Sequence, residues 1–163
     1  MPVKPFIPWP DKRLRTAAET VGTVTDAHRA IWQDMVDTMD AMPGVGLAAP
    51  QVGVMLRLAV VDASDTRGQA IRMADPEVIS VSDDMNTYPE GSPNLPGVSA
   101  QITRPARVVV AFTDHHGMRV RQEFVELWAT SVQHQIDHLA GKMYFDNLSK
   151  VKREMLVKKA RKA

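Results

Sequence analysis

The most specific chemical pattern in this sequence is a pair of histidines four residues apart. Residues 134–138 read His-Gln-Ile-Asp-His, and on a helix His134 and His138 share one face and can point at a single metal ion. In the corresponding metallohydrolase motif a glutamate follows the first histidine and takes a proton from metal-bound water. Here that residue is Gln135, and a carboxamide has no useful basicity. The pair is therefore either a metal site or two ordinary hydrogen-bonded helix residues.

Two further segments contain residues that could contact a ligand. Residues 44–51 (GVGLAAPQ) combine close glycines with small apolar side chains, so another chain can approach the exposed backbone N–H and C=O groups. The alternative interpretation of this segment is a tight structural loop. Residues 90–97 (EGSPNLPG), read alone, are typical of a proline-rich turn and nothing more.

Hydrophobic periodicity predicts the elements that must position these segments. Helical spacing of apolar residues predicts three helices, over residues 25–42, 125–140 and 148–162. Runs of β-branched and aliphatic residues predict strands over 55–63, 71–73 and 78–81, and a hairpin of 107–112 with 118–124. The helix over 125–140, which carries both histidines, would be central and buried. This order indicates an α+β fold, with antiparallel strands around a helix.

Composition excludes several kinds of site. The chain has 163 residues, 44% hydrophobic and 24% charged, which predicts a single domain over residues 1–163. Because there is no cysteine, disulfides, a cysteine nucleophile, thiolate zinc sites and iron–sulfur sites are excluded, and any metal must use His, Asp, Glu or weaker ligands. No run approaches the ~18–20 apolar residues that cross a bilayer, and the start lacks a secretion signal. We expect a cytoplasmic monomer without membrane contact.

The charge is unevenly distributed along the chain. Residues 147–163 hold seven Lys or Arg against the single Glu154, a net charge of +6, so the other 146 residues carry −5. A basic helix on a mildly acidic body suggests that the helix meets a polyanion, with nucleic acid the commonest candidate. The alternative is a solvated helix that aids solubility.

Taken together, in this order and spacing, residues 44–51, 90–97 and 134–138 resemble the motifs of the peptide deformylase family. Enzymes of this family remove the N-formyl group from the initiator methionine of nascent chains. The opening at residues 10–15 is also similar, so the likeness extends over nearly the whole chain. It implies the family's α+β fold, in which antiparallel strands surround a central helix that bears two metal-binding histidines.

The resemblance also implies a role for individual residues. His134 and His138 match the two imidazole ligands, and Ser92 stands at the position of the third ligand, a cysteine in the family. Gln51 matches the glutamine whose side-chain amide binds the formyl oxygen. Glu90 and Arg104 match a buried ion pair. The backbone positions that bind the peptide as an added strand are Val45, Gly46 and Gly91. Residues on the helical face of His134, which could line a pocket for the methionine side chain, are Leu127, Thr130 and Ser131.

Three positions depart from the family pattern. The ligand cysteine is Ser92, whose hydroxyl holds its proton far more tightly than a thiol. The next residue, whose N–H helps to form the oxyanion hole, is Pro93, which has no N–H. The general base is Gln135. Loss of a general base costs about 10²–10⁴ in rate and loss of one oxyanion donor about 10²–10³. Because such effects are not additive, we expect a combined deficit of roughly 10⁴ or more.

The sequence thus predicts a deformylase-like protein that binds a peptide N-terminus, such as formyl-methionyl, with deformylase activity absent or strongly reduced. It would hold no metal or a weakly bound divalent ion. The rival hypothesis is an active metal-dependent deformylase or related amidohydrolase that uses Fe²⁺, Zn²⁺ or Ni²⁺ with an atypical ligand set. Asp137 and Glu90 are then the acidic candidates for the third ligand, and we expect neither to serve. A third hypothesis is a structural module that contacts the ribosome through its basic C-terminal helix, as in bacterial deformylases.

Overall fold

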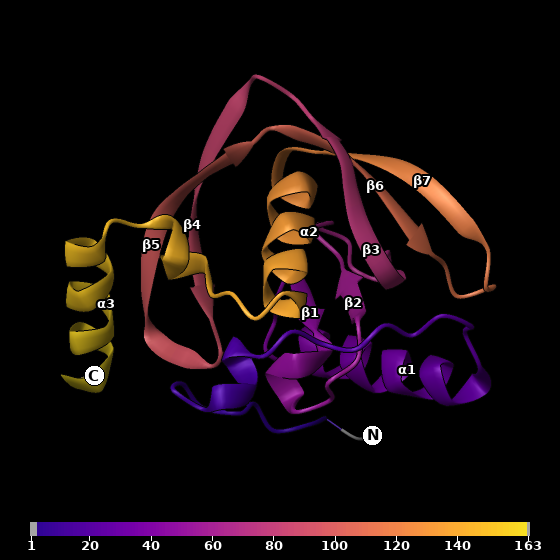
Figure 1. Cartoon of the computed structure of the whole chain (residues 1–163), viewed down its shortest axis with the longest axis horizontal. Helices are drawn as coiled ribbons and strands as arrows, with labels where there is room; N and C mark the ends of the chain where they lie inside the picture. The colour runs from indigo at the N-terminus through magenta and orange to yellow at the C-terminus, as the bar shows by residue number, and fades with distance from the viewer. Residues whose placement is uncertain (1–2, 163) are drawn as a thin grey trace.

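The computed structural model describes residues 3–162, so the predicted domain limits at residues 1 and 163 lie outside the described residues. The helices are α1 (Asp26–Ala41), α2 (Glu126–Leu139) and α3 (Lys150–Lys162). The strands are β1 (Gly46–Ala48), β2 (Leu58–Val61), β3 (Ile71–Val81), β4 (Met85–Ser92), β5 (Leu95–Pro105), β6 (Arg107–Thr113) and β7 (Arg119–Val125). Three short 3-10 helices cover Lys12–Arg15, Ala49–Val52 and Tyr144–Asn147. The α+β class predicted from the sequence is confirmed (Figure 1).

Helix α1 confirms the helix predicted over 25–42 and lies against one end of the molecule (Figure 1). It begins after Thr25, whose backbone N–H donates a hydrogen bond to Nδ1 of His28. Its buried face carries Trp32, which is fully buried and whose indole N–H donates to the carbonyl of Met73 in β3 over 3.1 Å. This contact joins α1 to the sheet.

Five strands form one antiparallel sheet in the order β1-β2-β3-β6-β7. The predicted hairpin corresponds to β6 and β7, whereas β2 is shorter than the predicted run of 55–63. The two strands predicted on either side of Pro76 are one strand, β3, whose pairing with β6 shifts register between Ala74 and Glu77. Asp75 adopts a φ of 49° there, and its carboxylate accepts N–H groups from Val21 and Gly22. A bulge thus accommodates the proline that suggested a break.

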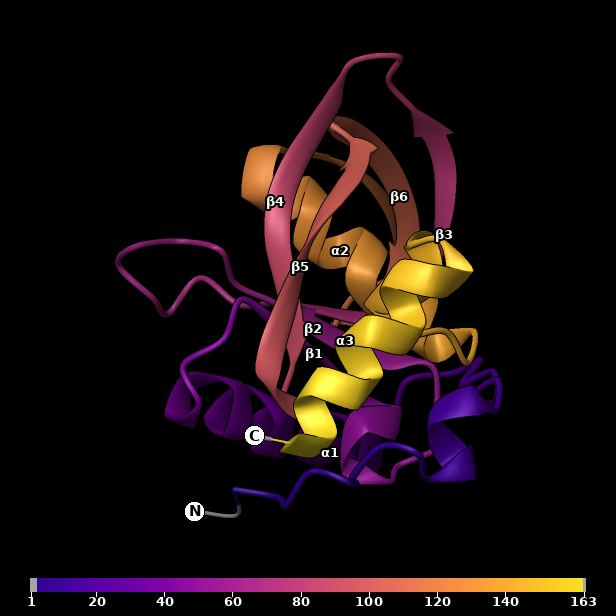
Figure 2. The ribbon, with the colours of Figure 1, turned by 90° about the vertical axis from the view of Figure 1, so that its left-hand side faces the viewer.

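Strands β4 and β5 form a separate two-stranded sheet that the sequence pattern did not predict. Residues 90–97, interpreted as only a proline-rich turn, are the end of β4, a tight turn and the start of β5, with Ser92 paired to Leu95. Prolines are tolerated because each strand has only one partner within residues 3–162, so a missing N–H can face the unpaired edge. Figures 1 and 2 show this long hairpin rising beside α2.

Helix α2 is the central helix, as predicted for 125–140. It packs against β1 and β2, against β6 and β7, and against β4 and β5, so strands surround it on both sides (Figures 1 and 2). The chain leaves α2 through Gly141, which has a φ of 79° and whose N–H donates to the carbonyl of His138. A Cβ at Gly141 would lie 2.8 Å from the backbone of Arg15, so glycine is required there on two grounds.

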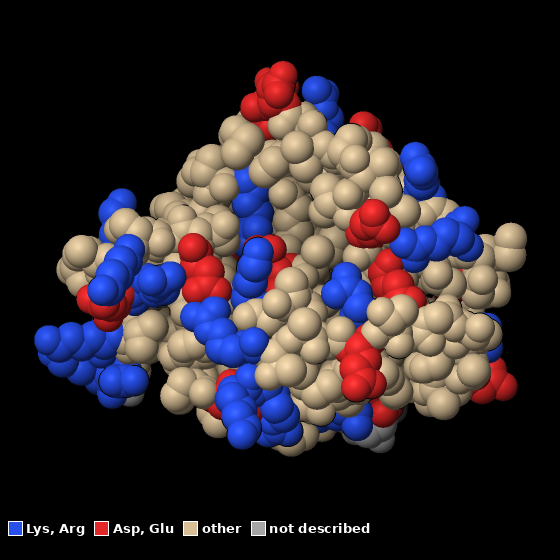
Figure 3. Space-filling view, viewed as in Figure 1, with Lys and Arg blue, Asp and Glu red and all other residues tan. Residues whose placement is uncertain are grey.

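Helix α3 lies outside β5, at the margin of the molecule (Figures 1 and 2). Its inward-facing Leu156, Val157 and Ala160 pack on a core cluster that includes Phe145 and Ile102. Figure 3 shows Lys and Arg side chains gathered where α3 lies. Among the helices of residues 3–162, none is long and apolar enough to cross a membrane.

Candidate functional site

A cavity of about 440 Å³ lies between the start of β1, the end of β4 and the face of α2. The structure places all six predicted peptide-contacting residues in its wall: Val45, Gly46, Gly91, Leu127, Thr130 and Ser131. Gln51, Ser92, His134 and Gln135 line it as well. Each of β1 and β4 has a single pairing partner within the described residues, so both present an unpaired edge at this cavity. An unpaired strand edge can accept an extended peptide through backbone hydrogen bonds.

The side chains of His134 and His138 meet on one face of α2, one helical turn apart. Their Nε2 atoms are 3.1 Å apart, and both side chains are buried. Nδ1 of His134 lies 2.8 Å from Oε1 of Glu90, and this carboxylate places the ring proton on Nδ1. Glu90 thus holds the His134 ring from its Nδ1 side and leaves Nε2 directed toward His138, which is how a carboxylate commonly orients a metal-ligating imidazole.

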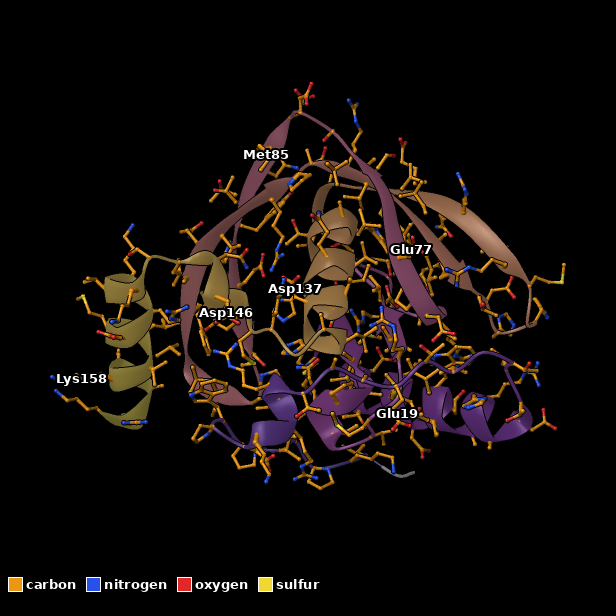
Figure 4. The ribbon with its side chains drawn as sticks, in the orientation of Figure 1. Glu19, Glu77, Met85, Asp137, Asp146 and Lys158 are labelled. Atoms are coloured by element: carbon orange, nitrogen blue, oxygen red, sulfur yellow. The ribbon has the colours of Figure 1, made fainter. Side chains whose placement is uncertain are left out.

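Glu90 and Arg104 form the buried ion pair that the family resemblance implied. Nε and Nη2 of Arg104 donate to the two carboxylate oxygens over 2.8 and 3.0 Å. Burial alone would raise the pKa of Glu90, but hydrogen bonds from His134 and Arg104 outweigh it and hold the pKa below its ordinary value. The third guanidinium nitrogen donates over 2.9 Å to Asp137, on the side of α2 that faces β4 and β5 (Figure 4). Both acidic candidates for a third ligand are thus paired with Arg104.

His138 lies behind His134, away from the cavity wall. Burial is the main reason that the pKa of His138 lies well below its ordinary value, and the neighbouring His134 and Arg104 lower it further. The ring is therefore neutral. Its Nδ1 atom is buried without a hydrogen-bond partner among the described residues, as is the hydroxyl of Tyr144. Tyr144 stacks on His134 with ring centroids 6.0 Å apart. Unsatisfied buried polar atoms are rare, and their concentration around this pair is typical of a functional site.

Ser92 is buried, and Asn94 holds its hydroxyl in place. Oγ of Ser92 donates to Oδ1 of Asn94 over 3.0 Å. The amide of Asn94 in turn donates to the carbonyls of Ile7 and Gln51 over 2.6 and 2.9 Å. Sequence reasoning missed Asn94. Its only signal was an amide side chain, which can both donate and accept hydrogen bonds, placed between two prolines in a segment that was assigned to a turn.

Gln51 is fixed by the same network. Its Oε1 accepts the N–H of Ala48 over 2.9 Å, and its Nε2 donates to Oδ1 of Asn94 over 2.9 Å and lies 3.4 Å from Oγ of Ser92. The side chain is almost wholly buried and its tip borders the cavity. Its position is therefore set by β1 and by the turn between β4 and β5.

The remaining two departures from the family pattern also lie in the cavity wall. Pro93 contributes a backbone nitrogen that has no hydrogen to donate. Gln135 lies beside Gly46, where a Cβ would come within 2.4 Å of its Nε2 atom. Its Oε1 atom is buried and has no hydrogen-bond partner among the described residues. The site therefore contains neither a carboxylate base at this position nor an N–H at Pro93.

The donor atoms around the histidine pair determine how well a divalent metal fits. Zinc-bound imidazole nitrogens lie about 2.0–2.1 Å from the ion, so two Nε2 atoms 3.1 Å apart suit two ligands of one ion. The third position fits poorly, because the Ser92 hydroxyl is neutral and already donates to Asn94. Within residues 3–162, no group of three or more His, Cys, Asp or Glu side chains is arranged to hold an ion. Two ligands fit and the third does not.

Comparison with known proteins agrees with the fold. The family model described as polypeptide deformylase matches residues 3–154. Over its whole length the chain is 41% identical to a peptide deformylase of Afipia carboxidovorans, covering 96% of that protein, and 39% identical to one of Methylocella silvestris, covering 86%. It superposes with a TM-score of 0.92 on the peptide deformylase of Ehrlichia chaffeensis in complex with actinonin, at 33% identity and with 99% and 98% of the two chains covered.

Proposed function

Because the chain belongs to the polypeptide deformylase family, we propose that it binds the N-terminus of a peptide, formyl-methionyl above all, and hydrolyses the formyl group slowly or not at all. The observation that carries this proposal is the set of residues beside the histidine pair, Ser92, Pro93 and Gln135. Amide hydrolysis needs an activated nucleophile, donors for the oxyanion and an acceptor for the proton. These residues supply a neutral hydroxyl, a nitrogen without hydrogen and a carboxamide.

The sizes of these effects support a large deficit. Loss of the general base costs about 10²–10⁴ in rate and loss of one oxyanion donor about 10²–10³. A site in which Ser92 replaces a thiolate would also hold a divalent metal weakly, if at all. Since residues that act together have non-additive effects, the proposal is a combined deficit of about 10⁴ or more.

Retention of the binding frame supports the other half of the proposal. The unpaired edges of β1 and β4 can receive a peptide strand at Gly46 and Gly91. Leu127 and Thr130 on α2 would contact the methionine side chain, and Gln51 is fixed with its amide at the cavity. The strand edges at Gly46 and Gly91 and the side chains of Leu127 and Thr130 do not include the three substituted positions.

Two measurements on the unmodified protein test the proposal. Calorimetry with formyl-Met-Ala-Ser should give saturable binding below millimolar concentration. Formate release from the same peptide should be about 10⁴-fold slower than that of an active deformylase assayed in parallel. Rapid formate release would overturn the proposed loss of activity, and no binding at millimolar peptide would overturn the proposed role in binding.

The second candidate is an active metal-dependent deformylase with an atypical ligand set. The arrangement of His134 and His138 favours it, because both Nε2 atoms converge and Glu90 orients the first ring. Metal analysis of the purified protein separates the candidates. Stoichiometric iron, zinc or nickel that survives dialysis would favour the enzyme, whereas a protein that loses added metal on dialysis would favour the binder.

We further propose that the protein is a single-domain monomer in the cytoplasm, the compartment in which nascent chains are processed. We also propose that α3 contacts ribosomal RNA. The charge of α3 supports this contact, because six of its seven basic side chains are exposed and the remaining one, Arg153, is half-buried. Phosphate contacts would make such binding strongly salt-dependent. The salt dependence of ribosome binding is therefore the measurement that tests it.

A further inference from the structure

Gln135 has hydrogen-bonding capacity that the fold does not use. Its side chain is 4% exposed and lines the cavity, and its Oε1 atom is buried without a partner among the described residues. Leaving a buried polar group unpaired is as a rule more unfavourable than the net gain from one hydrogen bond. A ligand that pairs with this carboxamide would relieve that cost.

A second glutamine on the same helix, Gln133, shows an amide whose hydrogen bonds the fold does use. Gln133 lies two residues earlier, and its Nε2 donates to the carbonyls of Pro105 and Ala129 over 3.1 and 2.9 Å. Its amide thereby connects α2 to the end of β5. Among the described residues Gln135 joins no two elements in this way, so its buried amide is not explained by the packing of the helix.

The neighbours of Gln135 place its amide where a peptide N-terminus would lie. Its Nε2 atom would be 2.4 Å from a Cβ at Gly46, on the strand edge that faces the cavity. Ser131, one turn earlier, is already engaged, because its hydroxyl donates to the carbonyl of Val45 over 2.8 Å. Gln51 is engaged through both of its amide atoms. Of these polar side chains in the wall, Gln135 is therefore the one with an acceptor to spare.

The chemistry of a carboxamide indicates which ligand group it would select. A carboxamide offers one acceptor and two donor hydrogens, and its last torsion angle is broad, so either atom can turn toward a ligand. A formylated N-terminus is a neutral amide with one N–H and one C=O. The carboxamide of a glutamine has an acceptor for this N–H and a donor for this C=O. A free N-terminus is an ammonium, whose burial beside a neutral group is unfavourable.

We propose that Gln135 is the specificity-determining residue that makes this cavity prefer a neutral N-acylated terminus over a free amino terminus. This inference rests on the proposed function, since it assumes that a peptide N-terminus occupies the cavity. It gives the substituted position a positive role in recognition. A glutamate there would only accept hydrogen bonds when ionised and would favour a cation instead.

The test compares two peptides, formyl-Met-Ala-Ser and Met-Ala-Ser, by calorimetry in the presence of EDTA. The wild type should bind the formylated peptide at least about tenfold more tightly, and Gln135→Leu should lose about tenfold for the formylated peptide alone, the scale of one or two neutral hydrogen bonds. Gln135→Glu should reduce or reverse the preference for the formylated peptide over the free one. The matched control is Gln133→Leu on the same helix, which should keep the wild-type preference.

The results separate a failure of the role proposed for Gln135 from a failure of peptide binding itself. If Gln135→Leu keeps the full preference for the formylated peptide, the role of Gln135 is wrong while peptide binding stands. If the wild type binds both peptides equally, the inference fails in the same way. If the wild type binds neither peptide, the proposed function fails and the inference with it. Should Gln135→Leu not fold, the nearly isosteric Gln135→Glu decides by its effect on the preference.

Discussion

The hydroxyl of Ser92 donates a hydrogen bond to Oδ1 of Asn94 over 3.0 Å, and the same oxygen accepts one from Nε2 of Gln51 over 2.9 Å. The serine at the third ligand position therefore belongs to a hydrogen-bond network that also fixes the amide of Gln51. A neutral, hydrogen-bonded hydroxyl is a poor metal donor, whereas a thiolate at the same position would be a strong one. This relationship makes the proposed loss of metal binding testable.

Restoring the three substituted residues should restore hydrolysis. We expect Ser92→Cys, Pro93→Leu and Gln135→Glu to give little activity singly, and the triple variant to retain metal and release formate at least about 10⁴-fold faster than the wild type. Metal content and formate release, measured on the same preparations, check this. A triple variant that retains metal but stays inactive would show that other residues limit the reaction.

Asn94 should be essential for stability. Asn94→Ala removes the amide that pairs with Ile7, Gln51 and Ser92, and it leaves several buried groups unpaired. We expect the free energy of unfolding to fall by about 2–4 kcal/mol. Urea denaturation measures it, with Asn86→Ala as the control, because Asn86 makes one long hydrogen bond, of 3.3 Å, to the exposed Glu126. Equal losses in the two variants would contradict this account.

A methyl group at Gly46 should interfere with the cavity more than with the fold. In Gly46→Ala the new Cβ would lie 2.4 Å from Nε2 of Gln135 and 2.5 Å from Oγ of Ser131, so both side chains must move. We expect peptide affinity to fall by about tenfold or more, since a shift of this size removes hydrogen bonds worth about 1.4 kcal/mol. Calorimetry checks this. Gly22→Ala, at a strained φ of 73° with open space around it, should lower stability and leave affinity unchanged.

The carboxylate of Asp146 should contribute stability that disappears in acid. Burial alone would raise its pKa, but hydrogen bonds from Arg15 and the N–H of Met143 hold it below the ordinary 3.8. Because the folded-state pKa is lowered, the contribution is present above the unfolded-state value and is lost as the pH falls through the folded-state value. Asp146→Asn should thus destabilise the protein at pH 7 and progressively less below about pH 4.

Urea denaturation at several pH values measures this trend. Asp26→Asn is the matched control, because the side chain of Asp26 is 99% exposed. A stability difference for Asp146→Asn that stayed constant between pH 7 and pH 3 would contradict the assignment.

Charge reversal on α3 should weaken binding to ribosomes without unfolding the protein. Deleting the helix is a poor test, because Leu156, Val157 and Ala160 pack on the core. Lys152→Glu with Lys159→Glu changes only exposed side chains. We expect weaker sedimentation with ribosomes and a shallower salt dependence. Lys142→Glu, an exposed change outside α3, should have no effect, and equal effects of both variants would indicate non-specific attraction.

Local patterns predicted the helices and the α+β class well, because α1 and α2 have clear apolar faces and clear stops at Pro43 and Gly141. They failed for the hairpin of β4 and β5. Strand propensity there is masked by prolines, which are tolerated because each strand has a single partner in the described part of the chain. That is a property of the sheet and not of the segment.

The site could be predicted only in part for a similar reason. The spacing of His134 and His138 placed them on one face, and resemblance supplied Gln51, Glu90 and Arg104. Nothing in the sequence indicated the network of Asn94, because its partners Ile7 and Gln51 lie 87 and 43 residues away. The unpaired Oε1 of Gln135 could not be predicted either, since it depends on what the surrounding elements leave without a partner.

The walls of the cavity come from three segments distributed along the chain, residues 42–51, 89–93 and 127–135. The cavity can therefore exist only after the distant parts of the polypeptide have come together. By mass action, any molecule that occupies it shifts the folding equilibrium toward the native form, by about 2.7 kcal/mol at a hundred times its dissociation constant. A rise in melting temperature is thus a general readout for candidate ligands, including those for which no chemical assay exists.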